Sequence, residues 1–287
     1  MTQVETETTK LAPGTRLGAV ELTVTDLDRS ASFYEDSIGL RTHRREDGRA
    51  ALGAGGEDLL VVVEDPDAHP AGRHAGLYHF ALLHPSRPEL ARAAARLART
   101  GTPIQGASDH GISKTIYLPD PDGNGIELAA DRPKEQWPDL SVMSGGPDPL
   151  DLDALLESVA DEEPQESVDP NATIGHLHLH VGDLQESTRF YVEVVGFEIM
   201  TYLPSAVFVA AGGYHHHVGF NTWRGPDVPP APQGTVGLRY FTVLLRDEAE
   251  LAALRKRALA AGVQVEDALE GTLLRDPSGN ALLFRPA

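Results

Sequence analysis

Hydrophobic and polar positions follow the same order twice along the chain. Residues 17–40, LGAVELTVTDLDRSASFYEDSIGL, align without a gap on residues 174–197, IGHLHLHVGDLQESTRFYVEVVGF. Each copy shows the alternation of a strand, an Asp-Leu helix start, an amphipathic helix with a Phe-Tyr pair, and a glycine stop. We therefore expect a strand and then a helix in both segments, with Asp26 and Asp183 as the helix N-caps.

Two further pairs of segments repeat at nearly the same offset. Residues 76–101 resemble 237–262, and the turn sequence of 117–128 (YLPDPDGNGIEL) resembles that of 273–284 (LLRDPSGNALLF). The chain therefore contains one internal duplication, and each half contains two units of strand, helix and several strands. The four units span 17–64, 76–130, 174–223 and 236–287.

A short sheet with one helix cannot close a core alone, so such units should pair through their sheets. The predicted fold class is α+β, with four βαβββ modules that pair into two open, barrel-like sheets. The predicted domains are an N-terminal domain at 14–132, an acidic linker at 133–172 and a C-terminal domain at 173–287. Within the linker, Leu150, Leu152, Leu155 and Leu156 form a partial apolar stripe that predicts a short helix, and the rest is typical of a solvated connector.

Charge and composition narrow the function classes. The chain has 24 Lys+Arg against 43 Asp+Glu, a formal net charge of −19, and ten of the acidic residues lie between 139 and 170. An acidic surface repels phosphate backbones and anionic lipids, so we expect neither nucleic acid nor membrane as a partner. Apolar runs are too short to cross a bilayer, and the N-terminal residues lack the apolar stretch of a signal peptide, so we expect a cytoplasmic protein.

Histidines carry the candidate chemistry, because the chain has 12 of them and no cysteine. His176, His178 and His180 alternate along one predicted strand and should share a face. His215, His216 and His217 are predicted on the last strand of the same module, with the middle residue facing the other way. His79 and Glu127 lie inside apolar strands, where a polar group needs a partner. Four other histidines are expected to be ordinary loop or surface residues: His43, His69, His74 and His84.

Comparison of the two halves singles out three of these polar positions. Tyr240 stands where the repeat has His79, Leu283 where it has Glu127, and Ala19 where it has His176. The fold thus tolerates other side chains at all three places. Two imidazoles and one carboxylate are the donor set of non-haem Fe(II) oxygenases, and the absence of thiols favours Fe or Mn over a closed structural zinc site.

The paired modules and these motifs resemble the vicinal-oxygen-chelate superfamily, and the second and third modules resemble the extradiol catechol 2,3-dioxygenases. The resemblance implies a metal site formed by His79, Glu127 and His176. It also implies supporting roles for Tyr117, ten residues before Glu127, and for a histidine in HGISKTIY. Residues that match the family's supporting and acid–base histidines are His110 and, within HHVGF, His216.

The distribution of ligands departs from the commonest dioxygenase layout, in which the third and fourth modules supply them. Here the fourth module lacks both of its ligands, so the metal site is predicted between modules 76–130 and 174–223. One site then requires the sheets of these modules to face each other, within one chain or by exchange between two subunits. The superfamily resemblance raises the expectation of a homo-oligomer.

The implied function is extradiol ring cleavage of a small aromatic diol with O2 at Fe(II), with Mn(II) as the alternative metal. His216, with a pKa near its ordinary value, is expected to act as acid and base, while Tyr117 and His110 hydrogen-bond the substrate. Three other functions share the fold: a hydroquinone-cleaving dioxygenase, a glyoxalase-like isomerase or lyase, and a metal-free small-molecule-binding resistance protein. The sequence does not fix the substrate, or the roles of His178, His180, His215 and His217.

Overall fold

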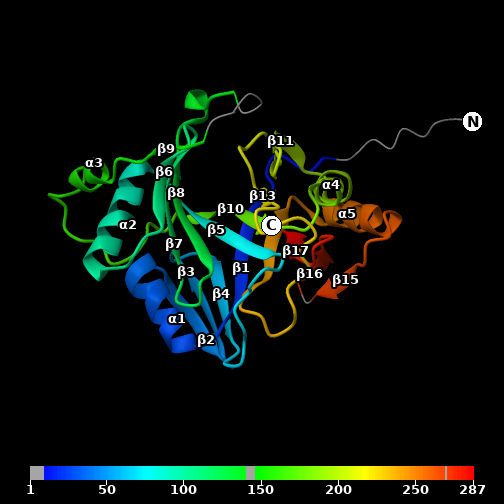
Figure 1. Ribbon diagram of the computed structural model, residues 1–287, viewed down its shortest axis with the longest axis horizontal. Coiled ribbons are helices and arrows are strands. Elements are labelled where there is room, and N and C mark those ends of the chain that lie inside the picture. The colour runs from blue at the N-terminus through cyan, green and yellow to red at the C-terminus, as the bar shows by residue number, and fades with distance from the viewer. Residues whose placement is uncertain (1–9, 140–145, 269) are drawn as a thin grey trace, which may run out of the picture.

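The computed structural model describes residues 10–139, 146–268 and 270–287, which form two mixed sheets with helices at the periphery (Figure 1). The first sheet contains β1 (Arg16–Val24), β2 (Arg41–Glu46), β3 (Arg49–Gly53), β4 (Asp58–Glu64), β14 (Gly237–Leu245), β15 (Glu266–Ala268), β16 (Gly271–Arg275) and β17 (Ala281–Pro286). Its strand order is β15-β16-β17-β14-β1-β4-β3-β2.

The second sheet contains β5 (Gly76–His84), β6 (Gly106–Asp109), β7 (Ser113–Pro119), β8 (Gly125–Asp131), β9 (Asp148–Pro149), β10 (Thr173–His180), β11 (Glu198–Leu203), β12 (Ala206–Ala210) and β13 (Val218–Asn221). Its order is β11-β12-β13-β10-β5-β8-β7-β6-β9. The α-helices are α1 (Leu27–Phe33), α2 (Arg87–Thr100), α3 (Leu152–Glu157), α4 (Leu184–Arg189) and α5 (Glu248–Ala260). In Figure 1, α1 and α2 lie on one side of the strands, and α4 and α5 on the other.

Each sheet combines one module from each half of the repeat. Strand β1 pairs antiparallel with β14, and β5 pairs antiparallel with β10. The predicted α+β class with open sheets is confirmed, and neither sheet closes into a barrel. Modules 76–130 and 174–223 meet within one chain. They join edge to edge in a continuous sheet, however, and the expectation that their sheets face each other was wrong. The domain limits at 132 and 173 stay a prediction, because the sheets cut across them.

The helix starts agree with the repeat, and their ends add a feature that the sequence pattern did not show. The side chains of Asp26 and Asp183 accept hydrogen bonds from the backbone N–H groups of the first turns of α1 and α4. Both helices then continue as π-helical turns, η1 (Tyr34–Ile38) and η4 (Phe190–Val195). Each turn ends at a glycine with positive φ, as expected where the chain leaves a helix in the left-handed region.

Equivalent side-chain contacts tie the modules within each half. The hydroxyl of Tyr34 donates to Asp120 in the first half, and that of Tyr191 donates to Asp276 in the second. These two carboxylates belong to the repeated D-P-x-G-N turns, so the turns hold the helical segment of the preceding module as well as feeding the last strand.

The connector between the halves packs on the fold more closely than predicted. The predicted short helix is present as α3, and Leu155 on it is fully buried. Strand β9 extends the second sheet by pairing with β6, and Arg92 on α2 forms an ion pair with Glu162 at 2.6 Å. The prediction of a solvated connector is therefore wrong for these parts of the segment, which pack on α2 and on the second sheet. A further one-turn helix, η2 (Lys134–Gln136), lies between β8 and β9.

One histidine and the lengths of the helices complete the description of the fold. His84 was expected at the surface, but it ends β5 with only 2% of its surface exposed, because α2 covers this face of the sheet. Among the described residues, no helix has both the length and the apolar character needed to span a lipid bilayer.

Candidate metal centre

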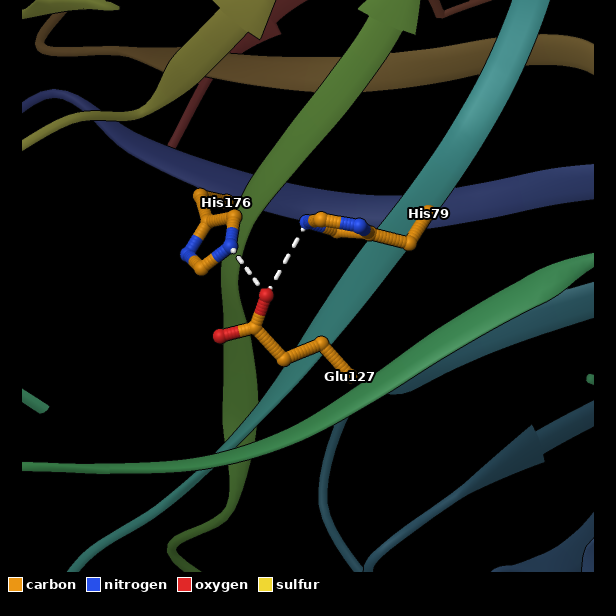
Figure 2. Close-up of side chains that lie close together, drawn as sticks. All are labelled: His79, Glu127 and His176. Carbon is orange, nitrogen blue, oxygen red and sulfur yellow. Dashed lines mark hydrogen bonds and ion pairs between the residues drawn. The ribbon is translucent and has the colours of Figure 1, made fainter. Parts of the chain in front are cut away.

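Three buried side chains from adjacent strands of the second sheet converge on one point (Figure 2). Nε2 of His79 on β5 lies 3.0 Å from Oε2 of Glu127 on β8, and Nε2 of His176 on β10 lies 3.2 Å from the same oxygen. One ligand atom from each residue lies within 4.8 Å of the others. The structure thus brings together the three residues that the sequence suggested as metal ligands.

Two β-bulges between β5 and β10 lie next to the two histidines of this cluster, His79 and His176. In the register His79 faces His178 and Leu77 faces Leu179, so Tyr78 is an extra residue. The bulge turns Tyr78 toward the same side as His79, where their rings lie 4.8 Å apart. A second irregularity lies between Ile174 and His176, at Gly175.

Glycine suits position 175 for a steric reason. A Cβ atom there would lie 3.0 Å from Cβ of Leu83 on the neighbouring strand, closer than ordinary van der Waals contact. The backbone of β10 can therefore approach β5 immediately before His176, which fixes where the imidazole enters the site.

The surroundings favour an anionic carboxylate on Glu127, and burial favours a neutral imidazole on His176. Burial alone would raise the pKa of Glu127, but the attraction and hydrogen bond of His176, with a hydrogen bond from His79, hold that pKa well below its usual range. Burial lowers the pKa of His176, against the opposing effect of Glu127. A carboxylate with two nitrogen donors in this buried cluster fits a divalent cation, since these donors are those of open mononuclear iron sites.

His178 and His180 have a different partner, which distinguishes them from His176 on the same strand. The side-chain amide of Asn221 donates from Nδ2 to Nε2 of His178 at 2.9 Å, and Nδ1 of His180 donates to Oδ1 of the same amide at 2.9 Å. Asn221 is fully buried on β13 and satisfies both imidazoles. Polar pairing with one amide therefore explains two histidines whose roles the sequence left open.

The histidines at 215–217 precede β13 instead of lying on it, so the expected strand alternation does not apply. His215 and His216 both line a cavity whose walls also include His79, Glu127 and His176. His217 packs against Phe197 and accepts a hydrogen bond at Nδ1 from the backbone N–H of Ala211. His217 thus has a packing role outside the cavity.

A hydrogen-bond chain fixes the tautomer of His216. Nε2 of His215 lies 3.1 Å from Oδ1 of Asp131, so this nitrogen carries the proton that the carboxylate accepts. In the tautomer whose single proton is on Nε2, the His215 ring can only accept at Nδ1, which lies 2.8 Å from Nδ1 of His216. Nδ1 of His216 is therefore the donor, and the neutral ring then has its lone pair on Nε2.

The pKa of His216 differs from the expectation. Burial lowers it well below the ordinary value, and the neighbouring imidazoles of His176 and His215 lower it further. Burial therefore favours the neutral form of His216, in which a ring that carries its proton on Nδ1 has none on Nε2.

Tyr117 and His110 form a second polar pair beside the triad. Nε2 of His110 lies 2.9 Å from the hydroxyl of Tyr117, and the rings of Tyr117 and His79 lie 5.6 Å apart. Burial and the nearby Glu127 carboxylate raise the pKa of Tyr117, while burial lowers the pKa of His110. The hydroxyl therefore keeps its proton, and the imidazole is neutral.

One cavity of about 590 Å³ is lined by the triad and by the neighbouring polar residues Tyr117, His110, His215 and His216, and its walls include aromatic rings. Sequence reasoning did not single out Tyr78 and Phe208 as lining residues or Asp131 as a partner of His215. The adjacency of Tyr78 to His79 was a signal, but strand alternation placed it on the opposite face. Trp223 also lines the cavity, and its ring lies 5.1 Å from that of His178.

Comparisons with known proteins agree with this architecture. Residues 16–128 and 173–284 match the family model of the Glyoxalase/Bleomycin resistance protein/Dioxygenase superfamily. The chain is 41% identical over 284 residues to the protein named catechol-2,3-dioxygenase of Bacillus subtilis (strain 168), covering 96% of this chain and 98% of the relative.

Two solved structures share the fold at low sequence identity. One, from Bacillus subtilis subsp. subtilis str. 168, has a TM-score of 0.68 at 12% identity and covers 97% of this chain and 87% of its own. Glyoxalase I from Zea mays has a TM-score of 0.61 at 18% identity, covering 95% of this chain and 92% of its own. The family match spans both halves of the repeat, and the chain belongs to the Glyoxalase/Bleomycin resistance protein/Dioxygenase superfamily.

Proposed function

We propose that the protein is an extradiol ring-cleaving dioxygenase that opens catechol-type aromatics with O2 at a mononuclear non-haem Fe(II) site. The observation that carries this proposal is the buried cluster of His79, Glu127 and His176 at the wall of an aromatic-lined cavity. The 41% identity to a protein named catechol-2,3-dioxygenase, over nearly the whole of both chains, supports the same reaction class.

The three side chains would hold the metal as two neutral nitrogen donors and one carboxylate. When bound, the metal supplies charge neutralisation for the diol oxygens and brings diol and O2 together in one orientation. Three protein ligands leave coordination positions open for both, as an oxygenase requires.

In the proposed mechanism, His216 handles the substrate proton. Because Asp131 and His215 hold the proton of His216 on Nδ1, Nε2 is available to accept a proton from the diol hydroxyl. The same nitrogen can return that proton later in the reaction, which is the usual behaviour of a general acid–base imidazole.

The remaining polar and aromatic groups orient the substrate. A hydroxyl of Tyr117 that accepts from Nε2–H of His110 keeps its own proton for the substrate oxygen, where it stabilises negative charge. The rings of Tyr78, Phe208 and Trp223 line the cavity and offer apolar faces to an aromatic ring.

A test separates this function from the three alternatives. The metal-free protein is loaded anaerobically with Fe(II), catechol is added, and air is admitted while oxygen uptake and a yellow ring-fission product are followed. We expect one O2 to be consumed per catechol and no reaction without metal. A parallel sample loaded with Mn(II) shows which of the two metals supports turnover. Oxygen uptake with hydroquinone alone would favour the hydroquinone-cleaving alternative. Absence of uptake with every catechol and hydroquinone tested would contradict the dioxygenase proposal.

A further inference from the structure

A second cavity, of about 660 Å³, extends over the first sheet at positions that correspond to the metal pocket of the second. Tyr240 stands at the position of His79, Leu273 at that of Tyr117, and Glu21 at that of His178. The register of β1 and β14 is irregular after Glu21, so Arg239 is an extra residue beside Tyr240, just as Tyr78 is beside His79. The first sheet thus has the same bulge as the second, but different side chains stand at the corresponding positions of its cavity.

Glu21 is the centre of a positively charged cluster at this place. It is only 2% exposed and accepts hydrogen bonds from Nε of Arg239 at 2.8 Å and from the hydroxyl of Tyr240 at 2.9 Å. Arg49 forms a further ion pair with the same carboxylate. Two guanidinium groups therefore face one carboxylate, and the cluster has an excess positive charge.

Arg239 keeps hydrogen-bonding capacity in this arrangement. Its Nε is used by Glu21, whereas neither of its Nη atoms donates to another residue within the described part of the chain. The Arg239 side chain is 45% exposed and lines the cavity. Its guanidinium is therefore held in position at one end and open to a ligand at the other.

Other charges at the cavity preserve the positive excess. The second lining carboxylate, Asp122, is paired with Arg29, which lies outside the cavity lining. Arg224 lines the cavity and donates to the carbonyl of His74. Arg275 also lines it and is paired with Glu266 only at 3.6 Å. In a chain of net charge −19, a cavity with this balance selects anions.

The rest of the lining suits a small organic molecule. Leu77, Leu238 and Leu273 provide apolar surface beside the arginines. At Gly76 and Gly234 an added Cβ would meet no heavy atom within 4 Å, so the backbone here borders open space. A volume of this order lies in the range of ordinary small-molecule sites.

We propose that this cavity is a second ligand site, distinct from the metal pocket, that binds a small organic carboxylate. The carboxylate accepts charge-assisted hydrogen bonds from Arg239, Arg224 adds positive potential, and the apolar body of the ligand contacts the leucines. The site requires no metal, because the carboxylate of Glu21 is already satisfied by Arg49, Arg239 and the hydroxyl of Tyr240.

Calorimetric titration of the metal-loaded protein with benzoate tests the proposal. We expect saturable binding by the wild-type protein, at least about tenfold weaker binding by Arg239→Gln, and binding within about threefold of wild type by Arg239→Lys, which keeps the charge. Arg16→Gln is the matched control, since Arg16 pairs with Glu57 and does not line the cavity. Its affinity for benzoate should equal that of wild type.

Three comparisons define the ligand class and the place of binding. Neutral benzamide should bind at least about tenfold more weakly than benzoate, and inorganic phosphate should compete poorly because it lacks an apolar body. His216→Phe, in the metal pocket, should leave benzoate affinity unchanged. The proposal fails if wild type does not bind benzoate, if Arg239→Gln binds it equally, if phosphate competes as well as benzoate, or if His216→Phe abolishes binding. Should circular dichroism show Arg239→Gln to be unfolded, Arg224→Gln replaces it with the same expectation.

Discussion

The carboxylate of Asp131 accepts a hydrogen bond from Nε2 of His215 at 3.1 Å, and Nδ1 of the same His215 ring lies 2.8 Å from Nδ1 of His216. Asp131 ends β8, four residues after Glu127, and also accepts a hydrogen bond from Tyr214 at 2.7 Å. One strand therefore provides a candidate metal ligand and the group that orients the candidate base.

Asp131→Asn should lower turnover while leaving metal binding intact. The amide would donate where the carboxylate accepts, so the proton of His215 would move to Nδ1 and that of His216 to Nε2. We expect kcat for catechol cleavage to fall about 10- to 100-fold, with little change in KM. Asp58→Asn is the control, because Asp58 also binds a histidine, His43, but outside the cavity. Equal kcat in both variants would remove Asp131 from the mechanism.

His216→Phe should cut turnover by about 100-fold or more, since the general base is lost while the donor cluster is intact. Iron content and catechol affinity, measured anaerobically, should match those of wild type. His217→Phe carries the same change at the adjacent residue, which does not line the cavity, and should retain most of the turnover. Unchanged turnover in His216→Phe would contradict the proposed acid–base role.

His176→Gln and His178→Gln provide a matched pair on one strand and one face. Loss of His176 removes a proposed ligand, so metal affinity should fall by at least about 100-fold, as judged by metal content after dialysis. His178 is hydrogen-bonded to Asn221, and glutamine can replace that contact, so His178→Gln should keep its metal. The reverse result would move the ligand from His176 to His178.

The buried imidazole of His84 predicts a pH dependence of stability. Burial, with a contribution from the charge of Arg96, lowers its pKa to about 3, and neither ring nitrogen has a hydrogen-bond partner among the described residues. Below pH ~6.5 the unfolded chain binds a proton on His84, and the folded chain does not. The free energy of unfolding should therefore fall by about 1.4 kcal/mol per pH unit from pH ~6.5 down to about 3.

His84→Leu should remove this contribution, because leucine does not titrate. We expect the free energy of unfolding of the variant to rise steadily relative to that of wild type as the pH falls from ~6.5 to ~4.5. Above pH ~7.5 the difference between the two proteins should be constant. Urea unfolding at several pH values measures this. Parallel curves for the two proteins across the acidic range would show that His84 titrates normally in the folded state.

The sequence by itself determined the modules and the candidate chemistry. The repeat predicted four βαβββ units, the caps at Asp26 and Asp183, and His79, Glu127 and His176 as polar positions that the duplicate does not need. These features are local or follow from internal comparison, because strand alternation, capping and repeated turns depend on neighbouring residues.

Only the tertiary structure decided how these parts meet. Pairing of β5 with β10 inside one chain follows from packing between distant segments, which no local pattern specifies. The bulge that turns Tyr78 and His79 to one side breaks the alternation on which sequence reasoning relied, and His84 is buried because α2 covers its strand. The partnership of Asp131 with His215 joins residues 84 positions apart, so the tautomer of His216 depends on a contact that exists only in the folded protein.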